Sequence, residues 1–375
     1  MLDDLLDEEH EGKAEVFDET LLVPRDTSLC LGHDAIEANL LELFQKNKLP
    51  HALAFCGPRG IGKATFAYRL IRFLFHEQLS GAQGGAGLFG DEPLPPENMS
   101  IPTDSDAFAK VSSGGLSDLK IIEREFDETK GRYKGNIGID LIRKITPFLF
   151  STAAYGGWRV ILIDDADTMN RNAQNALLKN LEEPPKNCLI ILICHQMGKM
   201  LPTIKSRVRS YTFQPLSAPY MAKILDLMPS DMSAQDKEFI SIISAGSAGV
   251  AKEFIEDGGL SVAHKVMACF ENEHGYRMNA YDMANAFSGR GADQSLQSFK
   301  VFTSWLVHHL TKLKASNVSD LSEFTSLKLL NGFYIQKSLD ELIEVMDALA
   351  SHFNQCDKGN LDRHYTVYHA MELLK

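Results

Sequence analysis

The segment Ala54–Thr65, with the sequence AFCGPRGIGKAT, constrains the fold of this chain more than any other stretch. The apolar run HALAF precedes its glycines, and apolar residues recur at helical spacing after Lys63. A strand, a glycine-rich turn and a helix with the pattern GxxxxGK are typical of a phosphate loop, whose backbone N–H groups surround an anion. The residues expected to line a phosphate site here are Gly57, Gly60, Gly62, Lys63, Ala64 and Thr65.

One residue of this motif departs from the pattern. A Ser or Thr normally follows the lysine and binds Mg²⁺ through its hydroxyl, but this chain has Ala64. Thr65 comes one position late and therefore points about 100° round the helix. We expect a loop that can receive the phosphates of ATP or ADP weakly and without hydrolysis, with Mg²⁺ as a possible but poorly held cofactor.

Length and charge limit the classes of function. At 375 residues the chain is long for one core, so two or three domains are expected. Its 38 basic and 50 acidic residues give a net charge of −12, which argues against binding nucleic acid over the whole surface but allows a local basic edge. No apolar run is long enough for a membrane span, and the first residues are acidic, unlike a signal peptide. We expect a cytoplasmic protein without membrane contact.

The cysteine spacing argues against a metal site. The six cysteines form no CxxC pair, which argues against zinc, and disulfides are not expected in the cytoplasm. They are Cys30, Cys56, Cys188, Cys194, Cys269 and Cys356.

The first half of the chain alternates strands and helices. Residues 1–20 are charged and aperiodic, so we expect a disordered acidic tail. A Gly/Pro-rich insertion is expected at about 76–116. Strands are predicted at 51–55, 118–123, 159–164 and 188–194, with helices from about 34, after Lys63, at 138–150 and at 171–183, where Pro184 and Pro185 stop the last of them. Pro147 should bend or end the third of these helices. This alternation favours a mostly parallel sheet between helices over residues 21–214.

The second half has only helical patterns. Three short amphipathic segments predict a small helical lid over 215–259, and longer helices follow in 260–375. The apolar stripe of the segment 295–313 is read as core rather than as a cofactor site. Its residues are Leu296, Phe299, Phe302, Leu306, Leu310 and Leu313.

Two carboxylates end the strand 159–164. An aspartate in this place is the usual Mg²⁺ partner in nucleotide hydrolysis, and Asp164 fits that role. The next carboxylate commonly activates water and is usually Glu, whereas Asp165 is one methylene shorter and reaches less far. The alternative is that the pair only ends a strand and begins a loop.

These residues together resemble a known family. The segments RVILIDDADTMNRNAQNALLKNLEEPPKNCLIILICHQ and MLPTIKSRVRSYTF closely resemble the AAA+ core of bacterial clamp-loader subunits of DNA polymerase III. PHALAFCGPRGIGKAT and the terminal NLDRHYTVYHAMELL are similar to the same family, although the match thins after residue 215. The resemblance implies an α/β AAA+ P-loop domain, a small helical lid at 215–259 and an all-α collar at 260–375 that mediates oligomerisation.

The resemblance also assigns roles to single residues. Arg207, in the SR motif, matches the arginine that clamp-loader subunits insert in trans into the ATP site of a neighbour. Gly249 stands where motor subunits carry a second sensing arginine, and His195 falls near the first sensor. The zinc module of several relatives is missing between the phosphate loop and the second motif. The alternative for Arg207 is a surface salt bridge.

The pattern of losses favours one function over two others. Ala64, Asp165 and Gly249 weaken the chain's own site, while Arg207 is kept. We therefore expect a stator subunit in a hetero-pentamer with motor gamma/tau and delta-type subunits, acting with the sliding clamp and primed DNA. An active AAA+ ATPase motor or remodeller is the alternative, favoured by Lys63 and Asp164. A P-loop kinase is a third class, for which no acceptor pocket is recognisable.

Overall fold

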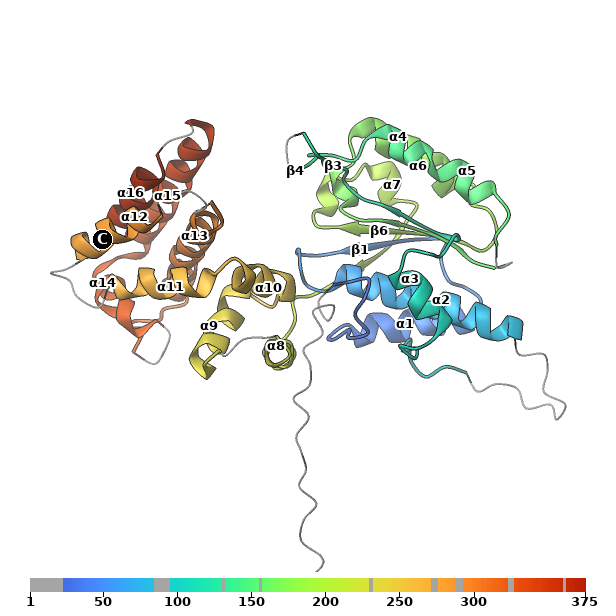
Figure 1. Ribbon diagram of the computed structural model, residues 1–375, viewed down its shortest axis with the longest axis horizontal. Helices are drawn as coiled ribbons and strands as arrows, with labels where there is room; N and C mark the ends of the chain where they lie inside the picture. The colour runs from blue at the N-terminus through green and yellow to red at the C-terminus, as the bar shows by residue number, and fades with distance from the viewer. Residues whose placement is uncertain are drawn as a thin grey trace, which may run out of the picture.

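The computed structural model describes residues 23–83, 95–129, 132–154, 157–228, 232–270, 276–287, 293–322, 327–359 and 362–375. The acidic tail expected at 1–20 lies outside these residues. Five parallel strands form one sheet in the order β2-β5-β6-β1-β7 (Figure 1). The strands are β1 Ala52–Cys56, β2 Leu119–Ile122, β5 Arg159–Ile163, β6 Cys188–Cys194 and β7 Arg209–Thr212.

Helices cover both faces of this sheet, as the alternation in sequence predicts (Figure 1). One face packs against α1 Asp34–Gln45, α2 Lys63–Gln83 and α3 Asp106–Ser112. The other packs against α4 Ile139–Arg143, α5 Ile145–Phe150 and α6 Arg171–Glu182. Every residue of β1 and β6 is buried. Apolar side chains on both sides of a strand are what a parallel sheet between two helical layers requires.

The register of the strands brings the sequence motifs to one edge of the sheet. Cys56 at the end of β1 pairs with Cys194 at the end of β6, and Ile163 of β5 pairs with Leu192. The phosphate loop, Asp164 and His195 follow these strands directly. Because the strands are parallel, the three segments meet at the carboxyl edge, where ligands bind in open α/β sheets.

The outermost strand of the sheet on the side of β1 is β7, which the sequence analysis did not identify. Strand β7 is short and mostly exposed, so it lacks the apolar pattern of the central strands. It pairs in parallel with β1, and its first residue Arg209 lies beside Leu53. The short helix α7 Pro202–Lys205 precedes it.

Two other segments differ in detail from the sequence-based boundaries. Helix α2 continues to Gln83, past the start expected for the insertion at residue 76. Met99, Ala107 and Val111 are buried in the same cluster as α2, so the described end of the insertion packs on the main core. The helix expected at 138–150 divides between Arg143 and Ile145. Pro147 explains this break, because it has no N–H to donate to the carbonyl four residues earlier.

A small hairpin follows β2. Its strands are β3 Phe126–Asp127 and β4 Arg132–Tyr133, which pair antiparallel. Arg124 lies between the end of β2 at Ile122 and the start of this hairpin at Phe126.

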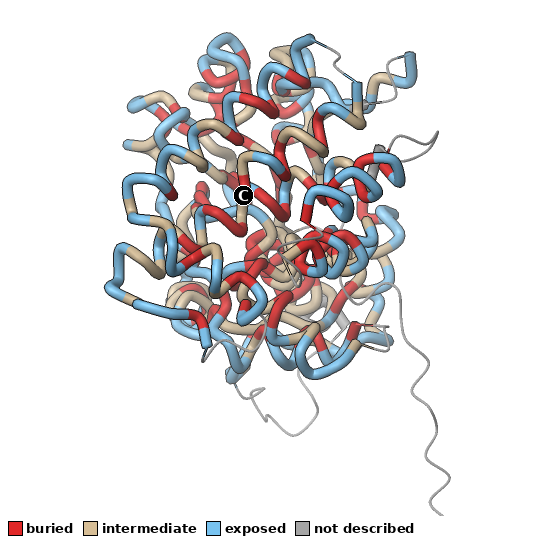
Figure 2. The backbone as a smooth tube through the Cα atoms, turned by 90° about the vertical axis from the view of Figure 1, so that its left-hand side faces the viewer, coloured by how far each residue is buried: buried red, intermediate tan, exposed pale blue. Residues whose placement is uncertain are grey.

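The rest of the chain is helical. Three short helices, α8 Ala218–Asp226, α9 Ala234–Ser244 and α10 Ala248–Glu256, form the lid segment. The longer region contains α11 Gly259–Ala268, α12 Tyr276–Ala286, α13 Asp293–Ala315, α14 Asn331–Gln336, α15 Leu339–Gly359 and α16 Arg363–Leu373. Figure 2 shows buried and exposed residues alternating along these helices.

The lid and the longer helices share one hydrophobic cluster, which runs from Leu216 to Leu374. Phe299, Phe302, Leu306 and Leu310 of α13 are fully buried in it, so the stripe is core as predicted. The sequence boundary near 259 therefore separates helices that share a core. Among the described residues, no helix combines the length and apolar character that crossing a membrane requires.

Candidate nucleotide site and exposed arginine

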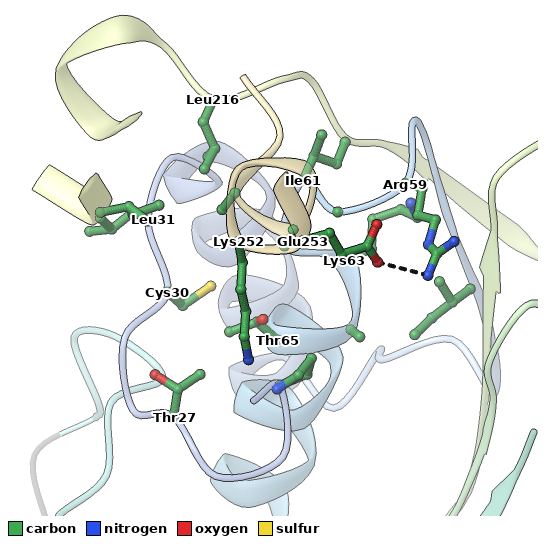
Figure 3. A pocket seen from close by; sticks show the side chains of 18 of the residues that line it. Thr27, Cys30, Leu31, Arg59, Ile61, Lys63, Thr65, Leu216, Lys252 and Glu253 are labelled. Carbon is green, nitrogen blue, oxygen red and sulfur yellow. Dashed lines mark hydrogen bonds and ion pairs between the residues drawn. The ribbon is translucent and has the colours of Figure 1, made fainter. Parts of the chain in front are cut away.

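A cleft of about 480 Å³ lies between the phosphate loop, the segment that precedes α1, and helix α10 (Figure 3). The sequence-predicted residues that line it are Gly60, Gly62, Lys63, Ala64, Thr65, Asp164 and Asp165. Gly57 lies at the start of the loop, next to the end of β6, and its N–H donates to the carbonyl of Cys194 over 3.2 Å. The structure thus brings the two predicted motifs together around one cavity.

The glycines give the loop its shape. Gly60 and Gly62 have φ values of 76° and 96°, a region that residues with a Cβ rarely adopt. Helix α2 begins at Lys63 directly after them, so its free N–H groups face the cleft. His33 fixes the loop from outside, because its Nε2 lies 2.8 Å from the carbonyl of Ile61. Sequence reasoning missed His33. The only signal for it was its position directly before the helix that begins at Asp34.

Lys63 is turned back onto its own loop. Its Nζ donates to the carbonyl of Gly57 over 2.8 Å and also to the carbonyl of Pro58. It lies 3.0 Å from Nδ1 of His195. The residue is only 3% exposed, and burial lowers the pKa of its ammonium group to about 8. The lysine that a phosphate loop directs at its ligand is therefore held by protein atoms.

His195 connects this lysine to the second motif. Because its Nδ1 accepts from the Lys63 ammonium group, its Nε2 carries the proton and donates to Oδ1 of Asp165 over 2.6 Å. Asp167 holds the backbone of this segment, since its carboxylate accepts from the N–H of His195 at 2.9 Å. The sequence placed His195 near the first sensor but did not show that it links two motifs.

Both oxygens of Asp165 are engaged. Its Oδ2 accepts from Arg124, at 3.0 Å from Nε and 2.8 Å from the terminal nitrogen. The hydrogen bond from His195 lowers the pKa of the Asp165 carboxyl group, and Arg124 acts in the same direction. A carboxylate held by two such donors is poorly placed to take a proton from water. Arg124 was not predicted as a site residue, because only the tertiary fold brings it beside Asp165.

Asp164 has a different environment. Its Oδ1 accepts from the N–H of Asp165 over 2.9 Å. Burial and the neighbouring Asp165 charge raise the pKa of its carboxyl group. The protein ligands expected for Mg²⁺ are reduced further, because Ala64 has no hydroxyl and both Asp165 oxygens are bound. Across the described part of the chain, no group of three His, Cys, Asp or Glu side chains could hold a metal ion. The residues of this site do not fit a magnesium ion.

Helix α10 of the lid contacts the loop through its first turn. The N–H of Gly249 donates to the carbonyl of Gly60 over 2.9 Å, and the Ser247 hydroxyl donates to the carbonyl of Arg59 over 2.9 Å. An exposed ion pair joins Arg59 to Glu253 at 3.0 Å (Figure 3). A Cβ on Gly249 would lie 2.8 Å from Cα of Gly60, so this contact excludes a side chain at the position expected for a sensing arginine.

Arg207 lies outside the cleft. Its side chain is 35% exposed and forms an ion pair with Glu182 at 2.8 Å. It also donates to the carbonyl of Thr203 over 2.9 Å. The salt bridge considered as the alternative reading is therefore present, at the end of α6.

The sheet register separates Arg207 from the chain's own phosphate loop. Arg209 pairs with Leu53, and Gly57 lies four residues further along β1. Four residues of strand span about 13 Å, and Arg207 lies beyond Arg209 at the amino edge of the sheet. The side chain therefore cannot reach the cleft of its own chain.

All six cysteines are free thiols, and five of them are buried. Cys56 and Cys194 flank the site on adjacent strands. A buried free cysteine packs as a small apolar residue, and the five buried cysteines lie in such surroundings.

Comparison with known proteins locates the similarity in the α/β part. A family model described as "DNA polymerase III, delta subunit" matches residues 32–217. The DNA polymerase III subunit delta' of Pseudomonas aeruginosa is 32% identical over 209 residues, which are 56% of this chain and 56% of that protein. The subunit delta' of Yersinia pestis is 40% identical over 157 residues, 42% of this chain and 39% of that protein. The chain thus spans about half the length, or less, of these curated relatives.

Other similarities are more distant. The DNA polymerase III subunit tau of Bacillus subtilis is 24% identical over 317 residues, 84% of this chain and 48% of that protein. Among solved structures, a DNA polymerase III gamma subunit-related protein of Thermotoga maritima is 16% identical, with a TM-score of 0.40 over 89% of this chain and 98% of that one. The family model and the delta' relatives point to the same kind of subunit. Through residues 32–217, the chain therefore belongs to the DNA polymerase III clamp-loader subunits of the delta-prime type.

Proposed function

We propose that this chain is a stator subunit of a clamp loader, which assists ATP-driven loading of the sliding clamp onto primed DNA in the cytoplasm. Its AAA+ face and its helical collar would bind motor subunits of the gamma/tau type and a delta-type subunit within a hetero-pentamer. Support comes from the relatives, which are named as delta' and tau subunits of DNA polymerase III. The chain's own contribution to chemistry would be one arginine.

The contrast between Lys63 and Arg207 carries this proposal. Lys63 is buried and bound to its own loop and to His195. Arg207 stands on the surface at the opposite edge of the sheet, where a neighbouring subunit can approach it. A guanidinium group is always charged and presents several donors in a plane, so it can stabilise the charge that develops on a transferred phosphoryl group. A site that has lost its catalytic groups can thus coexist with an arginine that serves another site.

The ion pair with Glu182 fits this role. Glu182 holds the guanidinium group of Arg207 at the surface in the isolated chain. Both residues are partly exposed, so the pair contributes about 1 kcal/mol or less to stability. Phosphate oxygens of a neighbouring nucleotide can therefore compete with Glu182 for the arginine at small energetic cost. The pair would orient Arg207 before assembly rather than stabilise the fold.

The test is the ATPase rate of a loader reconstituted with gamma/tau and delta-type subunits. Arg207→Ala should lower the rate stimulated by clamp and primed DNA by about threefold or more, since the sites of one loader would act in a coupled cycle and one of them loses its arginine. Arg209→Ala is the matched control, because Arg209 is an exposed arginine of the same segment. Its rate should stay near the wild-type value. An unchanged rate for the Arg207→Ala loader, at full assembly, would contradict the proposal.

A second variant separates the stator from the motor alternative. Lys63→Ala should leave loader turnover within about twofold of wild type, because a chain that hydrolyses no ATP contributes no turnover of its own. The isolated chain should show no measurable ATPase. Steady hydrolysis by the isolated chain that disappears in Lys63→Ala would favour the motor.

A further inference from the structure

We infer that the cleft takes a nucleoside diphosphate without a divalent metal ion, rather than a nucleoside triphosphate with Mg²⁺. This inference rests on the proposed function, because it takes the cleft to be a retained nucleotide site that performs no hydrolysis. It names the ligand of that site, and it depends on the arrangement of His195, the lysines and the carboxylates around the loop.

The position of His195 argues against a third phosphate. In a working P-loop site, the loop lysine reaches the outer phosphates, and a metal ion lies between them and the carboxylate of the second motif. Here the His195 ring lies between Lys63 and Asp165, the carboxylate that follows the expected metal partner Asp164, with Nδ1 3.0 Å from Lys63 Nζ and Nε2 2.6 Å from Asp165 Oδ1. The imidazole therefore occupies the space between the lysine and the second carboxylate. A terminal phosphate that took the place of His195 beside Lys63 would have to displace the ring.

The charges near the loop favour an anion at the amino end of α2. Arg124 and His195 bind the two oxygens of Asp165 and compensate its charge. Lys63 lies in the cleft wall beside the amino end of α2, where an anion is favoured, and the carboxylates of Glu253 and Glu256 in the same wall are paired with Arg59 and Lys252. Lys252 of α10 also lines the cleft, and its side chain points into it beside Thr65 while lying 3.7 Å from the carboxylate of Glu256 (Figure 3).

The metal ligands themselves are reduced. Ala64 offers no hydroxyl, Asp165 has no free oxygen, and one oxygen of Asp164 accepts from the backbone. Mg²⁺ requires near-octahedral oxygen coordination and gives up its water reluctantly. At the amino end of α2 the site therefore offers donors for an anion, and beside it few ligands for Mg²⁺.

The other wall of the cleft fits a nucleoside. The segment before α1 and the lid contribute apolar side chains, which are Leu29, Leu31, Leu216 and Ile224. Figure 3 shows Leu31 and Leu216 together on the side of the cleft away from Arg59. Apolar walls at one end and cations with helix N–H groups at the other match a base and a diphosphate. A free inorganic phosphate would use only the second half of this site.

The experiment is a calorimetric titration of the full chain with ADP and with ATP, each in EDTA and in excess Mg²⁺. The affinity for ADP should agree within about twofold in the two buffers. ATP should bind at least about tenfold more weakly than ADP, since its third phosphate meets His195. Tighter binding of ATP with Mg²⁺ than of ADP, or binding of ADP only in the presence of Mg²⁺, would overturn the inference.

Variants of His195 test the cause. His195→Ala should raise the affinity for ATP relative to ADP by at least about fivefold, because it vacates the space beside Lys63. His195→Asn, a smaller polar residue, should shift the same ratio in the same direction and covers the case in which the alanine variant folds poorly. His51→Ala is the control, since His51 binds the carbonyl of Leu181 at the other edge of the sheet. An unchanged ratio in both His195 variants would contradict the inference.

The two proposals can fail separately. If neither nucleotide binds to the chain while Arg207→Ala still slows the assembled loader, the cleft is not a nucleotide site and the inference is wrong, but the stator role stands. If ADP binds without metal while Arg207→Ala has no effect on the loader, the ligand is correctly assigned and the arginine role is wrong.

Discussion

The backbone N–H of Gly249 donates to the carbonyl of Gly60 over 2.9 Å, so the lid and the phosphate loop meet through two residues without side chains. A Cβ on Gly60 would lie 2.3 Å from the Ser247 hydroxyl, and a Cβ on Gly249 would lie 2.8 Å from Cα of Gly60. Each glycine is thus required by the other. The same contact closes the position at which a motor subunit would place a sensing arginine.

The first prediction concerns this contact. Gly249→Ala should lower the free energy of unfolding by about 1–3 kcal/mol, because the added methyl group forces the lid from the loop. Gly198→Ala is the control, since a Cβ there meets nothing within 4 Å. Urea denaturation of the full chain measures both. Equal stability of the two variants would show that the lid adapts without cost.

The second prediction concerns Ser247, which has two roles. Its hydroxyl accepts from the N–H of Val250 at 3.2 Å as the cap of α10, and it donates to the carbonyl of Arg59. Ser247→Ala should cost about 1–2 kcal/mol in the free energy of unfolding, as the loss of a helix cap does.

Arg59→Ala supplies the comparison for Ser247, because it removes the exposed ion pair with Glu253. We expect a change of at most about 1 kcal/mol from that variant. Denaturation in high salt should reduce the effect of Arg59→Ala and leave the effect of Ser247→Ala unchanged, since salt screens only the charges. A larger loss in Arg59→Ala than in Ser247→Ala would reverse this ranking.

The third prediction is a pH dependence of stability that comes from His33. Burial lowers the pKa of its ring, although the hydrogen bond to Ile61 acts in the opposite direction. A base with a depressed pKa in the folded state binds fewer protons there than in the unfolded chain. Its contribution to stability is complete above the unfolded pKa of about 6.5 and is lost as pH falls below that value.

The His33→Gln variant should therefore lose less stability than wild type between about pH 7 and pH 5. Thermal denaturation across this range measures the difference. Gln can still donate to the Ile61 carbonyl, so the comparison isolates the titration from the hydrogen bond. Parallel pH profiles of the two proteins would assign the acid sensitivity to other groups.

The fourth prediction concerns Glu182, which pairs with Arg207 at 2.8 Å. Glu182→Gln removes the charge but keeps an acceptor, so the ATPase rate of the assembled loader should fall less than in Arg207→Ala. We expect a change within about twofold, as for other partly exposed ion pairs. A loss as large as that of Arg207→Ala would mean that Glu182 is as necessary as the arginine itself.

Sequence reasoning succeeded where local pattern and tertiary environment agree. The strands β1, β5 and β6 are continuous apolar runs, and such runs are buried on both faces of a parallel sheet. The loop from Gly57 to Lys63 could be identified because glycine and lysine are required there by the backbone and by the ligand. Strand β7 could not, because an exposed edge strand has no apolar signature.

The site itself was predicted only in part. The sequence identified Lys63, Asp164 and Asp165, and it placed His195 near a sensor position. It did not reveal that His195 lies between Lys63 and Asp165, or that Arg124 binds the same carboxylate. These partners are separated by 30 to 132 residues, and no local pattern encodes which of them meet.

The amino-acid sequence alone determined that this chain has a parallel sheet between helices, a phosphate loop without its metal-binding hydroxyl, and a helical remainder. These features are local, because they follow from side-chain periodicity, glycine and the chemistry of single positions. Only the tertiary structure decided which charged and polar side chains meet at the cleft and which lie away from it. The register of β1 with β7 sets Arg207 at the edge away from its own loop, while the packing of β6 beside β1 brings His195 to Lys63. Such pairings are fixed by the sheet as a whole, since a shift of one residue in the register of a strand would move all of its side chains to the other face of the sheet.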